Sequence, residues 1–237
     1  ITTKIAWLIA ERGLDPESIL AVTFTNKAAD EMKGRIARML ERDVTGLWIG
    51  TFHSICLRLL RRHAERLGFR RAITVFDQED SLAVLRELLR GRGGADELPR
   101  VRKVQTIISA AKNRLWGPEE LLEHSRAPER ARLAEIYREY QEKLRAQDGA
   151  DFDDLLLLAV RLLQEHPDVR EGWARKFLHV LVDEFQDTNR IQLKLVQLLA
   201  SAHGNVMVVG DDDQSIYRWR GADVTNILRF EEHFPQA

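Results

Sequence analysis

The chain has 237 residues, of which 44% are hydrophobic and 31% are charged, and its formal net charge at pH 7 is -1. This length exceeds the common single-domain size and predicts one large α/β unit with an insertion, or two subdomains. The balanced charge excludes a globally basic nucleic-acid binder, so any surface of that kind must be local.

Cys56 is the only cysteine, which excludes an internal disulfide and a cysteine-cluster metal site and fits a cytoplasmic location. The sequence contains no apolar run of membrane-spanning length and no visible signal peptide, so we expect a soluble protein. No mutual ligand spacing relates His63, His124, His166, His203 and His233, which favours solvated or capping roles over a metal site. A helical pattern is already under way at Ile1, and we expect that the start is truncated.

The first part of the chain alternates strand and helix patterns. Apolar runs that end in small polar groups predict strands, and amphipathic runs predict helices. The pattern gives strands at 18–26, 47–53 and 73–76, and helices at 1–12, 27–40 and 54–66. This order predicts a doubly wound parallel sheet with helices on both faces. The arginines 58, 61, 62 and 66 are expected on the solvated side of the third helix.

Residues 78–150 have no strand signal and carry frequent charges and helix-breaking Gly and Pro residues. They predict an all-helical insertion subdomain, which divides a core made of residues 1–77 and 151–237. Its last helix has one apolar stripe, formed by Leu133, Ile136, Tyr137, Tyr140 and Leu144.

Two later apolar strands end in acidic residues. The run 177–182 leads into Asp183 and Glu184, and the run 205–210 leads into 211–215. Open α/β sheets bind ligands at the carboxyl ends of their strands. There Asp183 can hold a hydrated Mg²⁺ ion while Glu184 reaches a water. The alternative is an acidic turn in which residues 187–188 cap the next helix.

A loop at 216–223 interleaves two aromatic and two arginine side chains, Tyr217, Arg218, Trp219 and Arg220. Rings that stack on bases and guanidinium groups that hold phosphates are typical of single-strand nucleic-acid binding. The alternative is that Tyr217 and Trp219 seal the edge of the sheet.

Five strings follow one another in the order of a known family. They are AVTFTNKAA at 21–29, GTFH at 50–53, DFDDL at 151–155, VDEFQDTN at 182–189 and VGDDDQSIYRWRGA at 209–222. With these strings the chain resembles the superfamily 1 DNA helicases of the UvrD/Rep/PcrA type. The resemblance implies a RecA-like motor half that uses ATP to move 3′→5′ on single-stranded DNA in repair or replication.

The resemblance also implies roles for individual residues. Asp183 would bind Mg²⁺, Glu184 would act as the base toward the attacking water, and Gln214 would sense the γ-phosphate, so that all three contribute to the ATP site. The implied DNA-binding residues are Phe24, Thr25, Asn26, Thr51, His53, Phe152, Tyr217, Trp219 and Arg220. Contact with duplex DNA ahead of the motor is a hypothesis for Lys103, Lys112, Asn113 and Arg114 of the insertion. The implied partners are single-stranded DNA, junctions of single-stranded and duplex DNA, and a second RecA-like half of the same polypeptide, with no membrane.

The chain departs from the family in two respects, the lack of a phosphate-binding loop and the lack of the second RecA-like half. A phosphate-binding loop of the form G-x-x-x-x-G-K-[ST] is not found in its sequence, and residues 91–94 lack the lysine and follow no strand. We interpret the chain as a fragment without this loop and without the second half, and we expect it not to turn over ATP by itself. The alternatives are a non-catalytic single-stranded DNA-binding fragment and the motor part of a helicase-nuclease.

Overall fold

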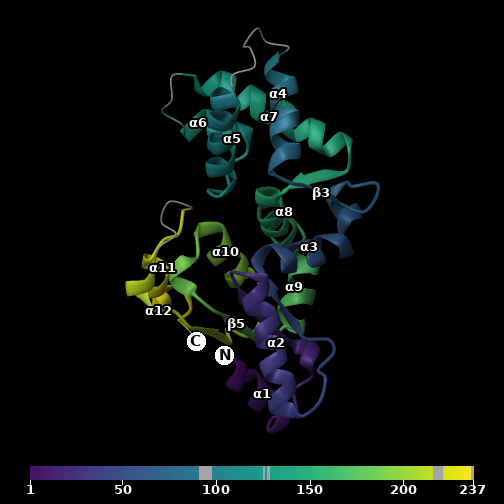
Figure 1. Cartoon of the computed structure of the whole chain (residues 1–237), viewed down its shortest axis with the longest axis vertical. Helices are drawn as coiled ribbons and strands as arrows, with labels where there is room; N and C mark the ends of the chain where they lie inside the picture. The colour runs from purple at the N-terminus through teal and green to yellow at the C-terminus, as the bar shows by residue number, and fades with distance from the viewer. Residues whose placement is uncertain (91–97, 125, 127–128, 216–220, 236–237) are drawn as a thin grey trace. The chain divides into compact units, whose positions relative to one another are not determined.

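The computed structural model describes residues 1–90, 98–124, 126, 129–215 and 221–235. The chain forms two compact units, Ile1–Leu59 with Ala159–Ala237 and Leu60–Leu158. The points of division lie within two helices labelled in Figure 1, α3 (Phe52–Arg62) and α8 (Phe152–Glu165). These points differ from the boundaries at 77/78 and 150/151 that the sequence pattern predicts.

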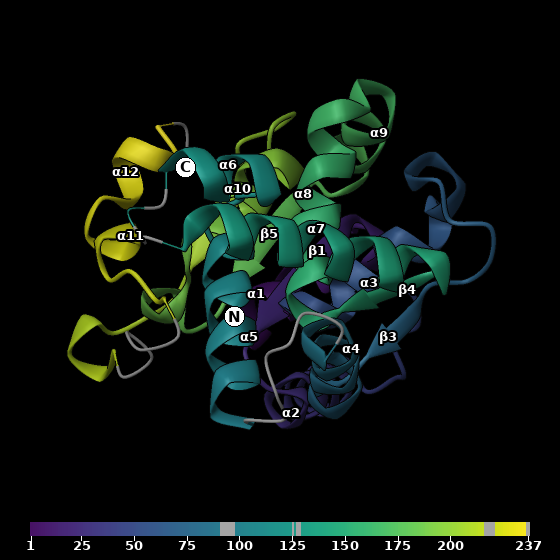
Figure 2. The same ribbon diagram turned by 90° about the horizontal axis from the view of Figure 1, so that it is seen from above.

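The first unit contains the predicted parallel sheet. Its four strands lie in the order β2-β1-β5-β6, and every neighbouring pair is parallel. The strands are β1 (Ile19–Thr23), β2 (Trp48–Thr51), β5 (His179–Val182) and β6 (Val206–Val208). Figure 2 shows β1 and β5 side by side. All residues of β1 are buried, as expected for a central strand with both faces covered.

Two helices cover one face of this sheet, α1 (Thr2–Ala10) and α2 (Asn26–Leu40). Apolar residues of both helices form a single core with alternate residues of the strands. The shared core includes Ile5, Leu8 and Ile9 of α1, Met32 and Ile36 of α2, and Ile19, Ala21, Ile49 and Leu181 of the sheet. The apolar spacing of each helix therefore determines which side it buries.

An aromatic cluster covers the opposite face, where Trp48 points. Its ring lies edge-on to Trp173 of α9 (Pro167–Lys176) and to Phe177, with ring centroids 4.9 and 5.3 Å away. The guanidinium of Arg58 is centred 3.6 Å from the Trp48 ring. Arg58 is exposed, as the amphipathic pattern predicts, and also shields a fully buried indole.

The helices after α8 were incompletely predicted. Pro167 lies beyond the end of α8 and occupies the first turn of a further helix, α9, where a proline costs no hydrogen bond. The next helix, α10 (Arg190–Leu199), is capped by Asn189 in a reciprocal capping box with Gln192, and not by residues 187–188. Two short helices follow, α11 (Thr225–Leu228) and α12 (Phe230–His233).

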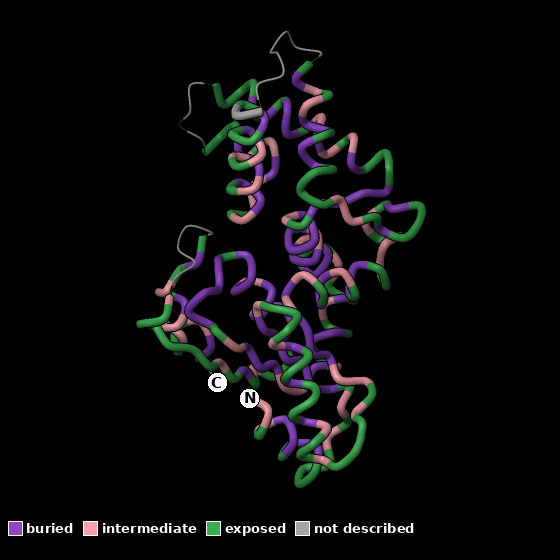
Figure 3. The backbone as a smooth tube through the Cα atoms, in the orientation of Figure 1, coloured by how far each residue is buried: buried purple, intermediate pink, exposed green. Residues whose placement is uncertain are grey.

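The second unit has a helical core of its own. Its helices are α4 (Gln78–Arg90), α5 (Leu98–Lys112), α6 (Pro118–His124) and α7 (Arg130–Ala146). All five residues of the apolar stripe predicted for α7 are buried in this core. Figure 3 shows the resulting alternation of buried and exposed turns along these helices.

The strand predicted at 73–76 does not join the main sheet. As β3 (Thr74–Phe76), it pairs in parallel with β4 (Gly149–Asp151), so the second unit is not entirely helical. The sequence Gly-Ala-Asp carries no β-branched or aromatic signal, which explains why β4 was missed. A side chain at Gly149 would overlap the Phe76 ring, with its Cβ only 2.4 Å from Cε2, so the pairing requires glycine.

A buried charged cluster joins α5, α7 and the start of α8. The ammonium of Lys112 lies 2.6 Å from Oδ2 of Asp151 and 2.8 Å from Oδ1 of Asp154, and the Tyr140 hydroxyl donates to Asp151 at 2.9 Å. Lys112 is fully buried, so the hypothesis that it contacts duplex DNA is wrong. The Asn113 amide donates to Asp153 at 2.8 Å.

Among the described residues, no helix has both the length and the apolar character needed to cross a membrane.

Candidate active site

The carboxyl ends of the four parallel strands place their following loops at one edge of the main sheet. The last registered pairs include Thr23 with Thr51, and Val182 with both Val22 and Val208. The segments that come next are 24–26, 52–53, 183–188 and 209–215. This edge is the usual ligand-binding edge of an open α/β sheet.

Asp183 and Glu184 leave the sheet directly after β5. The Asp183 amide donates to the carbonyl of Val22 at 2.9 Å, which continues the pairing with β1 and leaves Asp183 half-buried. Burial, with the nearby Glu184 charge, raises the pKa of Asp183 above its usual value. A cation bound at this carboxylate would offset both effects, since it favours the ionised form.

The backbone of Glu184 adopts the left-handed conformation, with φ 51° and ψ 43°. A non-glycine residue in this region carries a conformational cost, and such residues cluster at functional sites. The turn leaves Glu184 exposed while the next residue, Phe185, is fully buried. The carboxylate is therefore directed away from the core by the chain itself.

Gln214 lies in the loop after β6 and is joined to Glu184 by side-chain hydrogen bonds. Its amide donates to Oδ2 of Asp211 at 2.7 Å. The backbone N–H of Asp211 in turn donates to Oε1 of Gln186 at 3.1 Å. The side-chain Nε2 of Gln186 donates to Oε2 of Glu184 at 2.7 Å. The structure thus places Glu184 and Gln214 on one connected edge. Gln186 and Asp211 had no predicted role, although both stand within the recognised strings.

The donor set fits Mg²⁺, which prefers carboxylate oxygen and retains waters or phosphate oxygens as its other ligands. Among the described residues, no cluster of three or more His, Cys, Asp or Glu side chains forms a complete metal cage. A single carboxylate such as Asp183 is enough for an ion that arrives with a nucleotide.

The residues predicted to contact DNA in the first unit lie at the carboxyl ends of β1 and β2 and at the starts of the helices that follow, α2 and α3. The Thr25 hydroxyl accepts from the Ala28 amide at 3.1 Å and caps α2, and the Thr51 hydroxyl accepts from the Ser54 amide at 3.2 Å. Asn26 is exposed and His53 partly exposed. These two threonines therefore have structural roles at helix starts in addition to any contact with a ligand.

The predicted stacking residues differ in their surroundings. The ring of Phe24 is partly exposed and packs edge-on against Phe52 at 5.8 Å. Phe152, which lies in the second unit, is 50% exposed. Tyr217, Trp219 and Arg220 lie outside the described residues.

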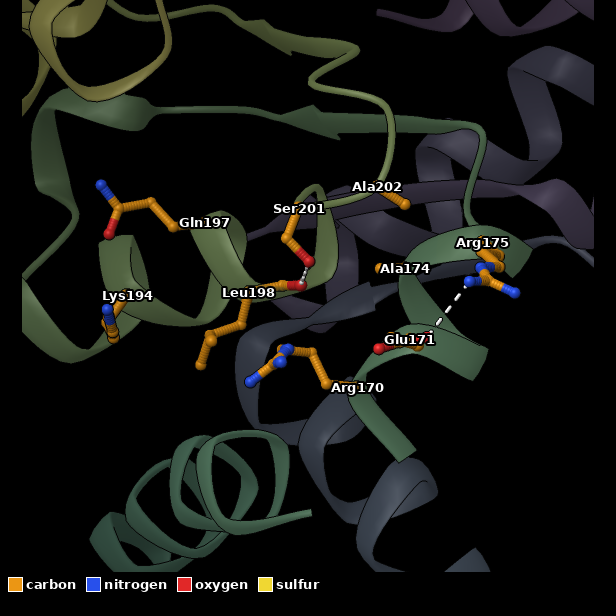
Figure 4. Close-up of a pocket in the computed structure, with 9 residues that line it drawn as sticks. All are labelled: Arg170, Glu171, Ala174, Arg175, Lys194, Gln197, Leu198, Ser201 and Ala202. Atoms are coloured by element: carbon orange, nitrogen blue, oxygen red, sulfur yellow. Dashed lines mark hydrogen bonds and ion pairs between the residues drawn. The ribbon is translucent and has the colours of Figure 1, made fainter. Parts of the chain in front are cut away.

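A separate pocket of about 640 Å³ lies in the first unit along α9 and α10 (Figure 4). Arg170, Arg175 and Lys194 line it, and Arg175 forms an ion pair with Glu171 at 3.1 Å. The pocket's lining segments lead into the amino ends of β5 and β6. Of the described residues that line it, none is a residue predicted for ATP or DNA, so this pocket is distinct from the acidic edge.

A parallel sheet covered by helices, with carboxylates and an amide after adjacent strands, defines an α/β protein with a ligand site at the carboxyl edge. The family described as UvrD/REP helicase N-terminal domain matches residues 1–235. The chain belongs to this family, and the resemblance deduced from the five strings is confirmed.

Similar proteins include the ATP-dependent DNA helicase PcrA of Bacillus subtilis (strain 168), which is 45% identical over 237 residues. The proteins of the same name from Staphylococcus epidermidis (strain ATCC 12228) and Staphylococcus aureus (strain Mu50) are each 41% identical over 237 residues. In each case the match covers 100% of this chain and 32% of the relative. The chain therefore spans about a third of the length of these relatives.

Proposed function

We propose that this chain is the first motor half of an ATP-dependent DNA helicase that moves 3′→5′ along single-stranded DNA in repair or replication. The observation that carries the proposal is the linked set of Glu184, Gln186, Asp211 and Gln214 at the carboxyl edge of the sheet. Family membership and relatives described as ATP-dependent DNA helicases support it.

The proposed chemistry is the transfer of the γ-phosphoryl group of ATP to water. A Mg²⁺ ion bound with the nucleotide would neutralise phosphate charge, and Asp183 would hold it. Glu184, which is exposed at the edge, would orient the water and accept its proton. Gln214 would donate a hydrogen bond to the γ-phosphate and lose that partner after hydrolysis.

The residues proposed to contact DNA are Phe24, Thr25, Asn26, Thr51, His53, Phe152, Tyr217, Trp219 and Arg220. Exposed rings such as Phe152 would stack on bases, and Asn26 and His53 would contact the backbone. We propose single-stranded DNA, and its junctions with duplex DNA, as the partner. The division into a motor half (1–77 and 151–237) and an insertion (78–150) is part of this proposal, as are a second RecA-like half and a cytoplasmic location.

The test is DNA-stimulated ATP hydrolysis by the full-length gene product. Glu184→Gln should lower turnover by about a thousandfold or more, because the water loses its base and orienting group. Glu165→Gln makes the same change at an exposed helix end and should leave turnover unchanged. Equal turnover by wild type and Glu184→Gln would refute the proposal.

Two further measurements address the finer points. Unwinding of duplexes with a single-stranded tail on only the 3′ or only the 5′ side tests the proposed polarity, and only the 3′-tailed substrate should be unwound. The 237-residue chain alone should not hydrolyse ATP, because its sequence contains no phosphate-binding loop. Steady hydrolysis by the purified chain would contradict this expectation.

A further inference from the structure

We propose that Gln186 is a positioning residue that sets the Glu184 carboxylate and the Gln214 loop in one geometry. This inference rests on the proposed function and assigns a role to a residue outside the predicted site. Both ends of the Gln186 amide are engaged, with Nε2 donating to Glu184 and Oε1 accepting from the Asp211 amide. One side chain therefore connects the loop after β5 to the loop after β6.

The partners determine the orientation of this amide. An ionised carboxylate only accepts hydrogen bonds and a backbone N–H only donates them. If the Gln186 amide were turned by 180°, its oxygen would face the Glu184 carboxylate and its NH₂ group would face the backbone N–H of Asp211. Acceptor would then meet acceptor, and donor would meet donor. A single orientation satisfies both contacts, so movement of either partner is transmitted to the other through one rigid planar group.

The two loops also approach each other too closely for a side chain. The Cβ of any residue placed at Gly210 would lie 2.4 Å from Oε1 of Gln186 and 3.1 Å from the Phe185 amide nitrogen. The backbone completes the junction, since the Phe185 amide donates to the carbonyl of Val209 at 2.9 Å. Gly210 therefore allows Gln186 to reach across to Asp211.

Gln186 is 1% exposed, while Glu184 is exposed beside it. It is therefore shielded from solvent and acts through its two neighbours. The side chain of Asp211 extends the chain of contacts, because its carboxylate accepts a hydrogen bond from Nε2 of Gln214 at 2.7 Å. The position of the proposed base and the position of the proposed phosphate sensor are consequently coupled by three hydrogen bonds.

The test uses the full-length gene product and the substitution Gln186→Met, which keeps the volume and removes both hydrogen bonds. We expect kcat for DNA-stimulated ATP hydrolysis to fall about 10- to 100-fold, as for other residues that orient a catalytic group, while KM for ATP changes less than about twofold. Gln197→Met is the matched control on the solvent-facing side of α10, and it should leave both constants unchanged.

Two more variants test whether Gln186 acts through Glu184. Gly210→Ala leaves Gln186, Glu184 and Gln214 in the sequence but pushes on the Gln186 amide and on Ile227, and it should lower kcat in the same way. In a Glu184→Gln background, Gln186→Met should cause less than about twofold further loss, because residues that act as a unit are not additive.

The outcomes separate this inference from the proposed function. If wild type hydrolyses ATP and Glu184→Gln does not, wild-type kcat in both Gln186→Met and Gly210→Ala would overturn the inference alone. A full additional 10- to 100-fold loss in the Glu184→Gln background would overturn it as well. If Glu184→Gln matches wild type, the proposed function itself is wrong.

Discussion

The ammonium of Lys112 lies 2.8 Å from Oδ1 of Asp154, and no part of the Lys112 residue is exposed. A second carboxylate, Asp151, lies 2.6 Å from the same ammonium, and Asp154 is also held by the amide of Gln141 at 3.0 Å. Two buried anions thus share one buried cation, and the cluster depends on the presence of all three charges.

Lys112→Met should destabilise the chain by about 3–5 kcal/mol, because it leaves two buried carboxylates without their cation. The methionine nearly preserves the volume, so the loss reports the charge and not a cavity. Urea unfolding at pH 7 measures the effect. Lys103→Met, at an exposed position of the same helix, is the control and should change stability by less than about 0.5 kcal/mol. Equal stability of the two variants would contradict the prediction.

The destabilisation by Lys112→Met should shrink as the pH falls from 7 to 5. Burial raises the pKa of Asp154 to about 6, a value that the Lys112 charge keeps from rising further. At Asp151 the effect of burial is outweighed by Lys112, so its pKa is lowered in the wild type. The contribution of this lowered pKa to the stability of the wild type is present above the ordinary pKa of about 3.9. It is lost only as the pH falls below that value.

Without Lys112, burial raises the pKa of both carboxyl groups, so the folded variant takes up protons at a higher pH than the unfolded chain. A group with a raised pKa in the folded state makes folding more favourable as the pH falls. Unfolding free energies of wild type and Lys112→Met, compared at pH 5, 6 and 7, test this sign. A difference between them that is constant or grows toward pH 5 would refute it.

Trp48→Ala should cost about 3–5 kcal/mol of unfolding free energy, as for other fully buried large aromatic residues. The loss combines the cavity between Trp173 and Phe177 with the contact to Arg58. Trp7→Ala removes the same side chain at a site that is 41% exposed, and should cost much less. Thermal or denaturant unfolding compares the two variants, and similar losses would contradict the assignment of Trp48 to the core.

Phe152→Ala should weaken binding of single-stranded DNA by about 1–3 kcal/mol, which is the usual effect of removing a stacked ring. Because Phe152 is half-exposed, its removal should change stability little. Fluorescence anisotropy with a labelled oligothymidine measures binding by the full-length gene product. Leu122→Ala, at another exposed apolar position, serves as the control. Unchanged binding by Phe152→Ala would remove this residue from the proposed interface.

The parallel sheet was predictable because its strands are continuous apolar runs that end abruptly in polar residues. The same feature placed Asp183 and Gln214 at one edge, since parallel strands bring their carboxyl ends together. By contrast, β3 and β4 have three residues each, and their pairing depends on Gly149 lying against Phe76. Such a contact leaves no periodic signal in the sequence.

The buried position of Lys112 and the bridging position of Gln186 could not be predicted from residue type. Lysine and glutamine are mostly exposed, and each is buried here because specific partners satisfy it. The partners of Lys112 come from a segment about 40 residues later in the chain. The resemblance predicts a role for Glu184, whereas the Gln186 amide that contacts it is identified only by the three-dimensional structure.

The pairing of β1 with β5 has a consequence for how the protein acquires its fold. Ile19 is registered with His179, so the whole second unit is synthesised between the two halves of one ladder. Until β5 emerges from the ribosome, the hydrogen-bonding edge of β1 that pairs with it has no partner, and closing so long a connection is slow. Nascent chains of this protein should therefore pass through an aggregation-prone intermediate during translation. In this intermediate, chaperone binding and misfolding compete with closure of the sheet.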